Sequence, residues 1–82
     1  MELEIYICRG HPWRPRCEGE KFATVRAVSG ALACSLCELE IPGWRWCVED
    51  VLPEVRIQAG LPPRILHVVT IGSNGKVTHG TR

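Results

Sequence analysis

The chain has 82 residues, so we expect one compact domain (residues 1–82). Its formal net charge at pH 7 is +1, whereas most nucleic-acid-binding domains are strongly basic. No apolar run approaches the roughly 18 residues needed to span a membrane, and residues 1–7 lack the basic and apolar segments of a signal peptide. We therefore expect a cytoplasmic protein. The five cysteines are an odd number, which excludes a complete set of disulfides within one chain.

The first third of the chain predicts two strands joined by a long loop. Residues 3–8 alternate apolar and polar side chains, as a half-buried strand does. Residues 9–19 contain glycines and prolines that predict a loop, and residues 21–28 are rich in β-branched and aromatic side chains. In the first strand, the side chains expected to face the core are Leu3, Ile5 and Ile7.

A helix is predicted next. Ser29 is a suitable N-cap, and Leu32, Leu36 and Leu39 recur at helical spacing, so these leucines are expected to face the core. Pro42 and the glycine after it should end the helix near residue 41.

The rest of the chain predicts an extended aromatic segment, a short helix and a second hairpin. Residues 44–48 read as extended, and residues 54–59 as a short helix. Residues 64–71 are apolar on both faces, as in a central strand, and Asn74-Gly75 is a hairpin signal before an edge strand at residues 76–79. The predicted fold is α+β, with two β-hairpins packed on one central helix.

The sequence contains two pairs of potential metal ligands, and within each pair the two ligands are separated by two residues, as zinc sites favour. Cys8 and His11 flank two residues that include Gly10, and Cys34 and Cys37 lie one turn apart on the predicted helix. A turn at the first pair and a helix carrying the second pair resemble, in outline, the zinc ribbon and the treble-clef zinc finger. Such a site would be structural, because four protein ligands leave no open coordination position.

Other assignments of these cysteines stay open. Cys17 could replace His11 as a ligand, and Cys47 could replace either. Cys34 and Cys37 could instead be small buried apolar residues of the helix, or disulfide partners in an oxidising compartment. Among the other histidines, His67 is expected in the core and His79 in solvent, neither as a ligand.

The same pair has the Cys-x-x-Cys spacing of thiol–disulfide oxidoreductases. In those proteins the first cysteine lies at a helix N-terminus, where the dipole lowers its pKa. With Ser29 as the N-cap, Cys34 would lie more than one turn inside the helix, where that effect is largely lost. A redox role is therefore the weaker interpretation.

Two segments mix arginine and tryptophan in a way that is typical of contact surfaces. Arginine pairs with phosphates and tryptophan stacks on bases, and both residue types are frequent hot spots in protein interfaces. The alternative is that Trp13, Trp44 and Trp46 cover the small core. The candidate binding residues are Arg9, Trp13, Arg14, Arg16, Trp44, Arg45 and Trp46.

The leading functional hypothesis is a small, non-enzymatic, zinc-stabilised binding module. Its expected partner is a nucleic acid or a nucleic-acid-associated protein, as for a regulatory adaptor or a phage-type inhibitor. One alternative, of a different class, is a thiol–disulfide redox protein that uses Cys34 and Cys37. Another is a structural subunit that forms a homodimer through the edge strand at residues 76–79.

Overall fold

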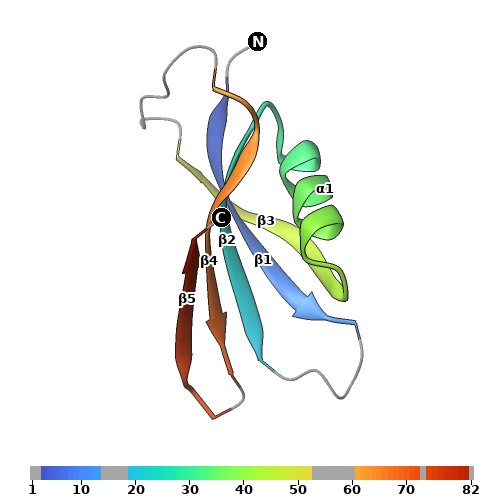
Figure 1. Cartoon of the computed structure of the whole chain (residues 1–82). Coiled ribbons are helices and arrows are strands. Elements are labelled where there is room, and N and C mark those ends of the chain that lie inside the picture. The colour runs from blue at the N-terminus through green and yellow to red at the C-terminus, as the bar shows by residue number, and fades with distance from the viewer. Residues whose placement is uncertain (1–2, 14–18, 53–60, 73, 82) are drawn as a thin grey trace.

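The computed structural model describes residues 3–13, 19–52, 61–72 and 74–81. The elements in chain order are β1 (Glu4–Pro12), β2 (Glu20–Ala27), α1 (Gly30–Glu40), β3 (Trp44–Leu52), β4 (Arg64–Ile71) and β5 (Val77–Thr81). The strands form one antiparallel sheet of 5 strands in the order β3-β1-β2-β4-β5 (Figure 1). The small α+β domain is thus confirmed, although the two predicted hairpins belong to a single sheet that β3 extends.

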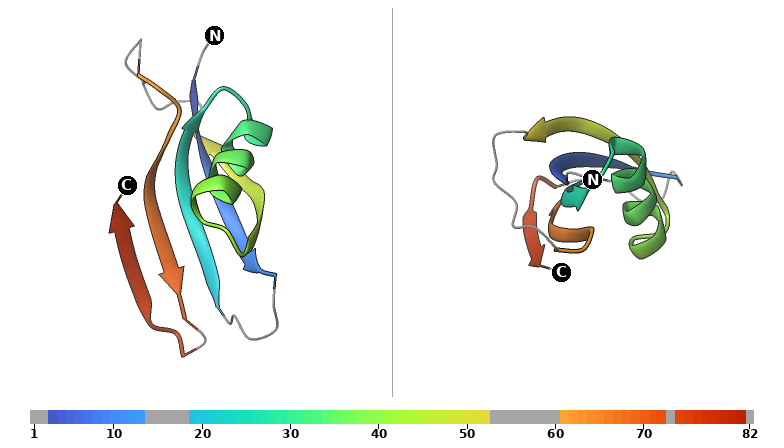
Figure 2. Two further views of the ribbon diagram at one scale, coloured as in Figure 1. Left: turned by 45° about the vertical axis from the view of Figure 1, so that its right-hand side comes forward. Right: turned by 90° about the horizontal axis from the view of Figure 1, so that it is seen from above.

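The helix lies on one side of this twisted sheet (Figure 2). It contacts β1, β2 and β3 most and β4 least, so β5 is left beyond its reach. Between helix and sheet lies the core cluster: Cys8, Ala23, Val25, Ala27, Ala33, Cys37, Ile41, Trp46, Ile65 and Val68. In the described part of the chain, no helix is long and apolar enough to cross a membrane.

The ends of α1 are where the sequence places them. The hydroxyl of Ser29 accepts a hydrogen bond from the backbone N–H of Leu32 at 3.2 Å, which satisfies one of the free donors of the first turn. The helix ends at Ile41, and Gly43 follows in the left-handed region with φ of 92°. The N-cap and the stop signal are both confirmed.

The face that α1 turns toward the sheet differs from the prediction. Ala33 and Cys37 are fully buried, whereas Leu32 is 49% exposed and Leu39 is 79% exposed. The helix runs so close to β3 that a β-carbon added at Gly30 would lie 2.8 Å from a β3 side-chain atom. Small side chains fill this gap, so the assignment of Leu32 and Leu39 to the core was wrong, whereas Leu36 does pack against the core cluster.

The predicted loop at residues 9–19 begins later than expected, because β1 continues to Pro12. Gly10 pairs with both neighbouring strands and lies directly under the indole of Trp46, where an added β-carbon would be 3.0 Å from ring atoms. The glycine therefore serves close packing within a strand and does not mark a turn. Pro12 is the last residue of the strand, where a missing N–H is tolerated.

The core side of β1 also differs from the prediction. Cys8 is fully buried under α1 and Tyr6 packs against the core cluster, so the even-numbered positions face the helix. Ile7 lies on the opposite face, and Ile5 is buried but outside the core cluster. The alternation of side chains along β1 does not show which face is buried, because both faces of the strand carry apolar side chains.

The second half of the fold follows the sequence closely. The aromatic segment becomes β3, and the apolar run at residues 64–71 is β4, an internal strand between β2 and β5. Beyond it, Gly75 has φ of 82° in the turn before β5, which forms an edge of the sheet. The short helix predicted at residues 54–59 lies outside the described residues.

Replacing Gly10 with alanine should destabilise the fold by about 1–3 kcal/mol, because the new methyl group would press on the Trp46 ring in a packed core. Urea unfolding measures this change. Gly80→Ala is the matched control, since a β-carbon at that strand position meets its nearest atom at 3.8 Å. Equal stability of the two variants would contradict the packing described for Gly10.

Candidate functional site

Three thiols gather between β1 and α1. Cys8 and Cys37 are fully buried, and Cys34 is half-buried against the same core. The hydrogen bond with the Cys37 thiol, followed by burial, raises the pKa of Cys8 far above its ordinary value. Burial and then the neighbouring Cys8 raise the pKa of Cys34 to about 11. These two groups are therefore neutral thiols at pH 7, because a buried thiolate beside another thiol is unfavourable.

The other predicted zinc ligands do not join this group. Because β1 runs straight through residues 8–11, Cys8 and His11 are not brought together by a turn, and His11 is exposed on the opposite face of the sheet. Cys47 also lies on that face, with its Sγ 3.7 Å from the carbonyl oxygen of Arg9, and Cys17 lies outside the described residues. Within residues 3–13, 19–52, 61–72 and 74–81, no three His, Cys, Asp or Glu side chains converge on a metal position.

The position of Cys34 also weakens the redox interpretation. The residue lies inside α1, more than one turn from the N-cap Ser29, and its pKa is raised to about 11. A nucleophilic cysteine needs the opposite shift, toward the thiolate. The described geometry therefore gives the Cys34–Cys37 pair the character of packed core thiols.

The sheet face opposite α1, here called the open face, carries the cationic and aromatic side chains. No described helix or strand packs on it, since α1 is on the other side and each strand contacts only its neighbours in the sheet. One row of successive partners crosses all 5 strands of this face. Its members are Cys47, Arg9, Phe22, Val69 and His79.

Trp13 lies at one corner of the open face. Its ring is 58% exposed, and the guanidinium carbon of Arg45 lies 4.5 Å from the ring centroid. The backbone N–H of Trp13 donates to the carbonyl of Gly43 at 3.2 Å, which fixes the corner to the start of β3. Together with His11 and Pro12, these side chains line a hollow of about 280 Å³. We call His11, Pro12, Trp13 and Arg45 the Trp13 corner; the alternative that Trp13 covers the core is wrong.

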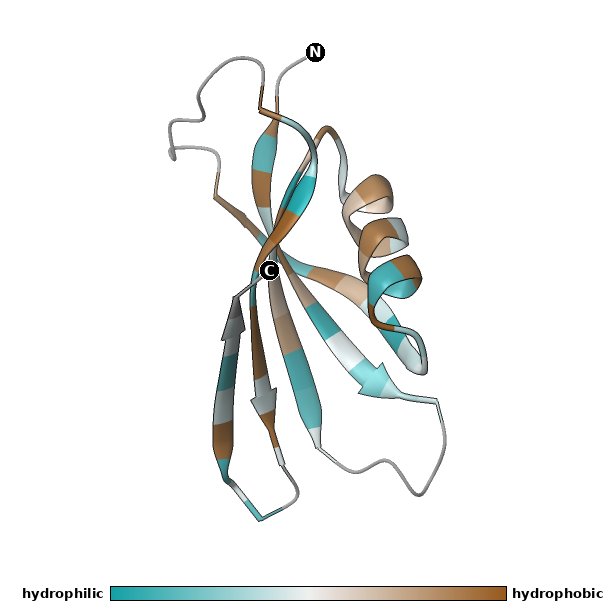
Figure 3. Cartoon of the chain, viewed as in Figure 1, coloured by the Kyte–Doolittle hydropathy of each residue, from teal (hydrophilic) through white to brown (hydrophobic). Residues whose placement is uncertain are grey.

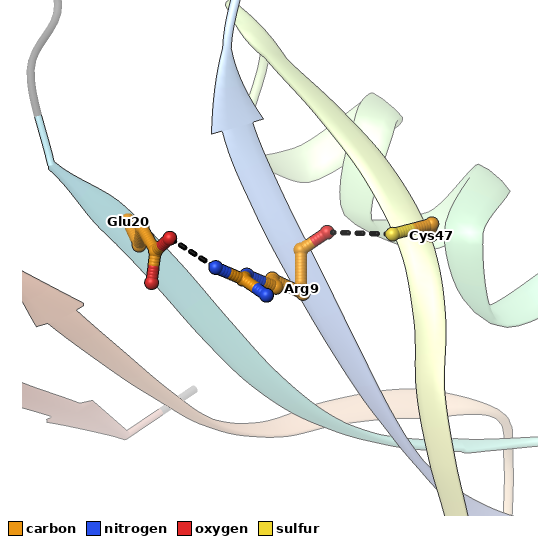
Figure 4. Close-up of polar contacts among 3 residues, drawn as sticks. All are labelled: Arg9, Glu20 and Cys47. Carbon is orange, nitrogen blue, oxygen red and sulfur yellow. Dashed lines mark hydrogen bonds and ion pairs between the residues drawn. The ribbon is translucent and has the colours of Figure 1, made fainter.

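Arg9 occupies the centre of the open face (Figure 4). Its guanidinium forms an ion pair with Glu20 and lies 5.8 Å from the ring centroid of Phe22. The hydrogen bond to Glu20 is the main cause that raises the pKa of Arg9. Its Nε is buried and has no hydrogen-bond partner among the described residues. The centre of the face therefore combines an aromatic ring, a cation and a carboxylate.

The other two tryptophans cover the core, as the alternative interpretation expected. Trp46 is only 5% exposed, and its indole N–H donates to the carbonyl of Ile41 at 3.4 Å. Trp44 is half-buried, with the ammonium nitrogen of Lys21 5.0 Å from its ring centroid. Of the candidate binding residues, the structure thus brings Trp13 and Arg45 together on the surface, while Arg14 and Arg16 lie outside the described residues.

Sequence reasoning missed two features of the open face. Phe22 was assigned only to a strand, yet it lies beside Arg9 at the centre of the face. His67 and His79 were treated separately, whereas Nε2 of His67 lies 3.1 Å from Nδ1 of His79 on neighbouring strands. The register of the β4–β5 hairpin makes His67 and His79 diagonal neighbours, because His79 is the partner of Val69 and His67 is the partner of Thr81.

In comparisons with known proteins, no family model, no curated protein and no solved structure matches this chain. No function can therefore be transferred from a relative.

The thiol cluster predicts that the protein loses stability in alkali. Because folding raises the pKa of Cys34 from 9.0 to about 11, the folded state holds this proton more tightly than the unfolded state. The resulting stability is fully present below about pH 9 and is lost as the pH rises to 11. The melting temperature should fall over this range, and fall less in Cys34→Ser.

Cys47→Ser is the control, since this exposed thiol lies outside the cluster and is a smaller cause of the raised Cys34 pKa than burial or Cys8, so its replacement should change the pH dependence much less than Cys34→Ser does. Serine is similar in size to cysteine and does not ionise in this range, so the comparison isolates the thiol proton. Identical alkaline slopes for the wild type and Cys34→Ser would argue against a shifted thiol at this position.

Proposed function

We propose that this protein is a non-enzymatic binding module that contacts nucleic acid through the Trp13 corner. The single observation that carries the proposal is an exposed Trp13 ring held beside the guanidinium of Arg45 at the surface. A base can stack on such a ring while a phosphate pairs with the arginine. In the sequence, Arg14 and Arg16 follow immediately and would add cationic contacts.

The corner is suited to binding because its backbone is already ordered. Trp13 is tied to Gly43 by a backbone hydrogen bond, and Arg45 and His11 are paired residues of β3 and β1. A ligand would therefore not have to order a loose segment, which reduces the entropy lost on binding. Figure 3 shows hydrophilic bands where β1 ends and β2 begins, so hydrophilic residues are concentrated at this end of the two strands.

A nucleic-acid-associated protein is the second candidate partner. Tryptophan and arginine are also the commonest hot-spot residues of protein interfaces. The specific observation in favour of a protein is the exposure of Leu32 and Leu39 on α1, since apolar side chains on the surface suit a protein partner better than a polyanion. A regulator or inhibitor of nucleic-acid machinery would be compatible with either partner.

Structural zinc remains a proposal for the thiol cluster. Cys8, Cys34 and Cys37 do not converge on a metal position as they lie, so their side chains would have to turn toward a common point, and metal binding would have to displace the protons of Cys8 and Cys34, whose pKa values are raised. The fourth ligand would have to come from outside the described residues, where Cys17 is the candidate that the sequence offers. The metal would join β1 to α1 and so stabilise the scaffold that carries the Trp13 corner.

The nucleic-acid proposal predicts salt-dependent binding to a fluorescent single-stranded oligonucleotide of random sequence. Trp13→Leu should weaken binding about fivefold to a hundredfold through lost stacking. Arg45→Gln should reduce the slope of log affinity against log salt by about 0.7, the value for one phosphate contact on a single strand. Fluorescence anisotropy at several salt concentrations gives both quantities.

Lys76→Gln is the matched control for Arg45→Gln, because it removes the same charge from the turn before β5, at the opposite edge of the sheet from β3. It should change the affinity much less than Arg45→Gln does. If wild-type protein does not bind at low salt, or if Trp13→Leu binds as well as the wild type, the Trp13 corner is not a nucleic-acid site.

The zinc proposal predicts about one equivalent of zinc in protein purified without added metal. A chelator should then lower the melting temperature, because metal binding to the folded state contributes folding free energy. Cys34→Ser should lose the metal, whereas Cys47→Ser, whose thiol is exposed and outside the cluster, should keep it. Metal-free protein whose melting curve does not respond to zinc or chelator would refute this role.

A further inference from the structure

The open face extends the Trp13 corner into a continuous surface. We infer that this face binds single-stranded nucleic acid, with Phe22 as a second stacking position and Arg9 beside it as a phosphate contact. The inference rests on the proposed function, since it assigns the partner of the Trp13 corner and continues its site across the sheet.

The first supporting observation is geometric. Arg9 and His11 are alternate residues of β1, whose side chains lie on the same face, and Trp13 directly follows the strand and lies with His11 and Arg45 at the edge of that face. Arg9 and Phe22 are partners on adjacent strands. The distance from Trp13 to the Arg9–Phe22 pair is therefore about four residues of strand, or roughly 13 Å. Two stacking positions at this separation are too far apart for one base or for two adjacent bases, and they fit two bases of one extended strand with an intervening nucleotide.

The second observation is the pairing of each aromatic ring with an arginine. Arg45 lies 4.5 Å from the Trp13 centroid, and Arg9 lies 5.8 Å from that of Phe22. Single-stranded nucleic acids are held by this combination of aromatic or guanidinium planes for bases and charges for phosphates. Double helices bury their base faces, so a site built from stacking positions selects unpaired strands.

The third observation is the separation of charge between the two sides of the sheet. The helix carries Glu38 and Glu40 and contains no lysine or arginine. The strand register places the acidic side chains of Glu20 and Asp50 on the open face, and Glu49, at the register shift of β3, also lies close enough for its charge to act on Arg9. The same register places there the arginines Arg9, Arg26, Arg45 and Arg64. Among the described residues the open face thus has four arginines against three carboxylates, a small positive excess that complements a phosphate backbone better than the acidic helix does.

The extent of the face sets the length of strand that it can hold. The row from Cys47 to His79 crosses four gaps between neighbouring strands, which amounts to roughly 19 Å at about 4.8 Å per gap. The half-buried Phe22 and Val69 lie in the middle of that row, and the His67–His79 pair lies at its far end. Since the Trp13 corner lies roughly 13 Å from the Arg9–Phe22 pair at the middle of this row, an oligonucleotide of a few residues can reach from one to the other.

The test uses labelled hexathymidine and hexauridine, so that DNA and RNA are both probed, with a hairpin duplex as competitor. Wild-type protein should bind both hexamers, and the duplex should compete poorly. Phe22→Leu keeps an apolar side chain but removes the ring, and should weaken binding to each hexamer about fivefold to a hundredfold. Tyr6→Leu is the matched control, because it removes an aromatic ring from the helix side of the neighbouring strand.

A second variant acts in the opposite direction. Glu20→Gln removes the carboxylate that pairs with Arg9 and should release the guanidinium for a phosphate. Binding should tighten, because a phosphate would no longer have to displace the Glu20 carboxylate from Arg9. A gain in affinity cannot arise from a variant that is merely poorly folded.

The outcomes separate this inference from the proposed function. If Trp13→Leu weakens binding but Phe22→Leu and Glu20→Gln do not change it, the Trp13 corner is a site and the open face is not. Equal competition by the duplex would overturn stacking on unpaired bases and leave only charge attraction. If neither hexamer binds at low salt, both proposals fail and a protein partner becomes the remaining candidate.

Discussion

The close approach of α1 to the sheet is the constraint on which the rest of the structure depends. Ala33 and Cys37 of the helix pack with Cys8 and Ala23 of the strands, and all four of these small side chains are fully buried. Small side chains make few contacts each, but close packing lets them bury a continuous apolar layer. One helix is thereby enough to form the core of this short chain.

This packing divides the chemistry of the protein between the two sides of the sheet. The thiols of Cys8, Cys34 and Cys37 lie with the helix, where burial and their mutual contact keep the first two protonated. The cationic and aromatic groups lie on the open face, ordered by the strands that carry them. Arg9 and Cys8 are adjacent in sequence yet serve different sides, because neighbouring residues of a strand point in opposite directions. The buried thiols of the core are thus separated by the sheet from the side chains that we propose to bind a ligand.

Local signals in the sequence predicted the positions of the helix and strands well. They did not predict which faces of these elements are buried, because that depends on packing between remote segments. The N-cap at Ser29, the internal strand β4 and the turn at Gly75 each depend on a few neighbouring residues, which the sequence displays directly. Gly10 looked like a loop residue because its packing partner, Trp46, is remote in the chain. The exposure of Leu32 and Leu39 could not be recognised from the sequence either. Leucine and alanine are both apolar, and which of them faces the core depends on how closely α1 approaches the sheet. For the candidate site, the sequence identified Trp13 and Arg45 but not Phe22, whose role follows from strand register.

The central claim is that the open face, and not the helix, is the binding surface of this protein. Its most direct test is an NMR titration of isotope-labelled protein with hexathymidine, following backbone amides and tryptophan indole signals. The claim predicts shifts at the Trp13 indole and along the facing positions of β1 and β2, with the buried Trp46 indole and the amides of α1 almost unchanged. Shifts confined to α1, or no shifts at low salt, would contradict it.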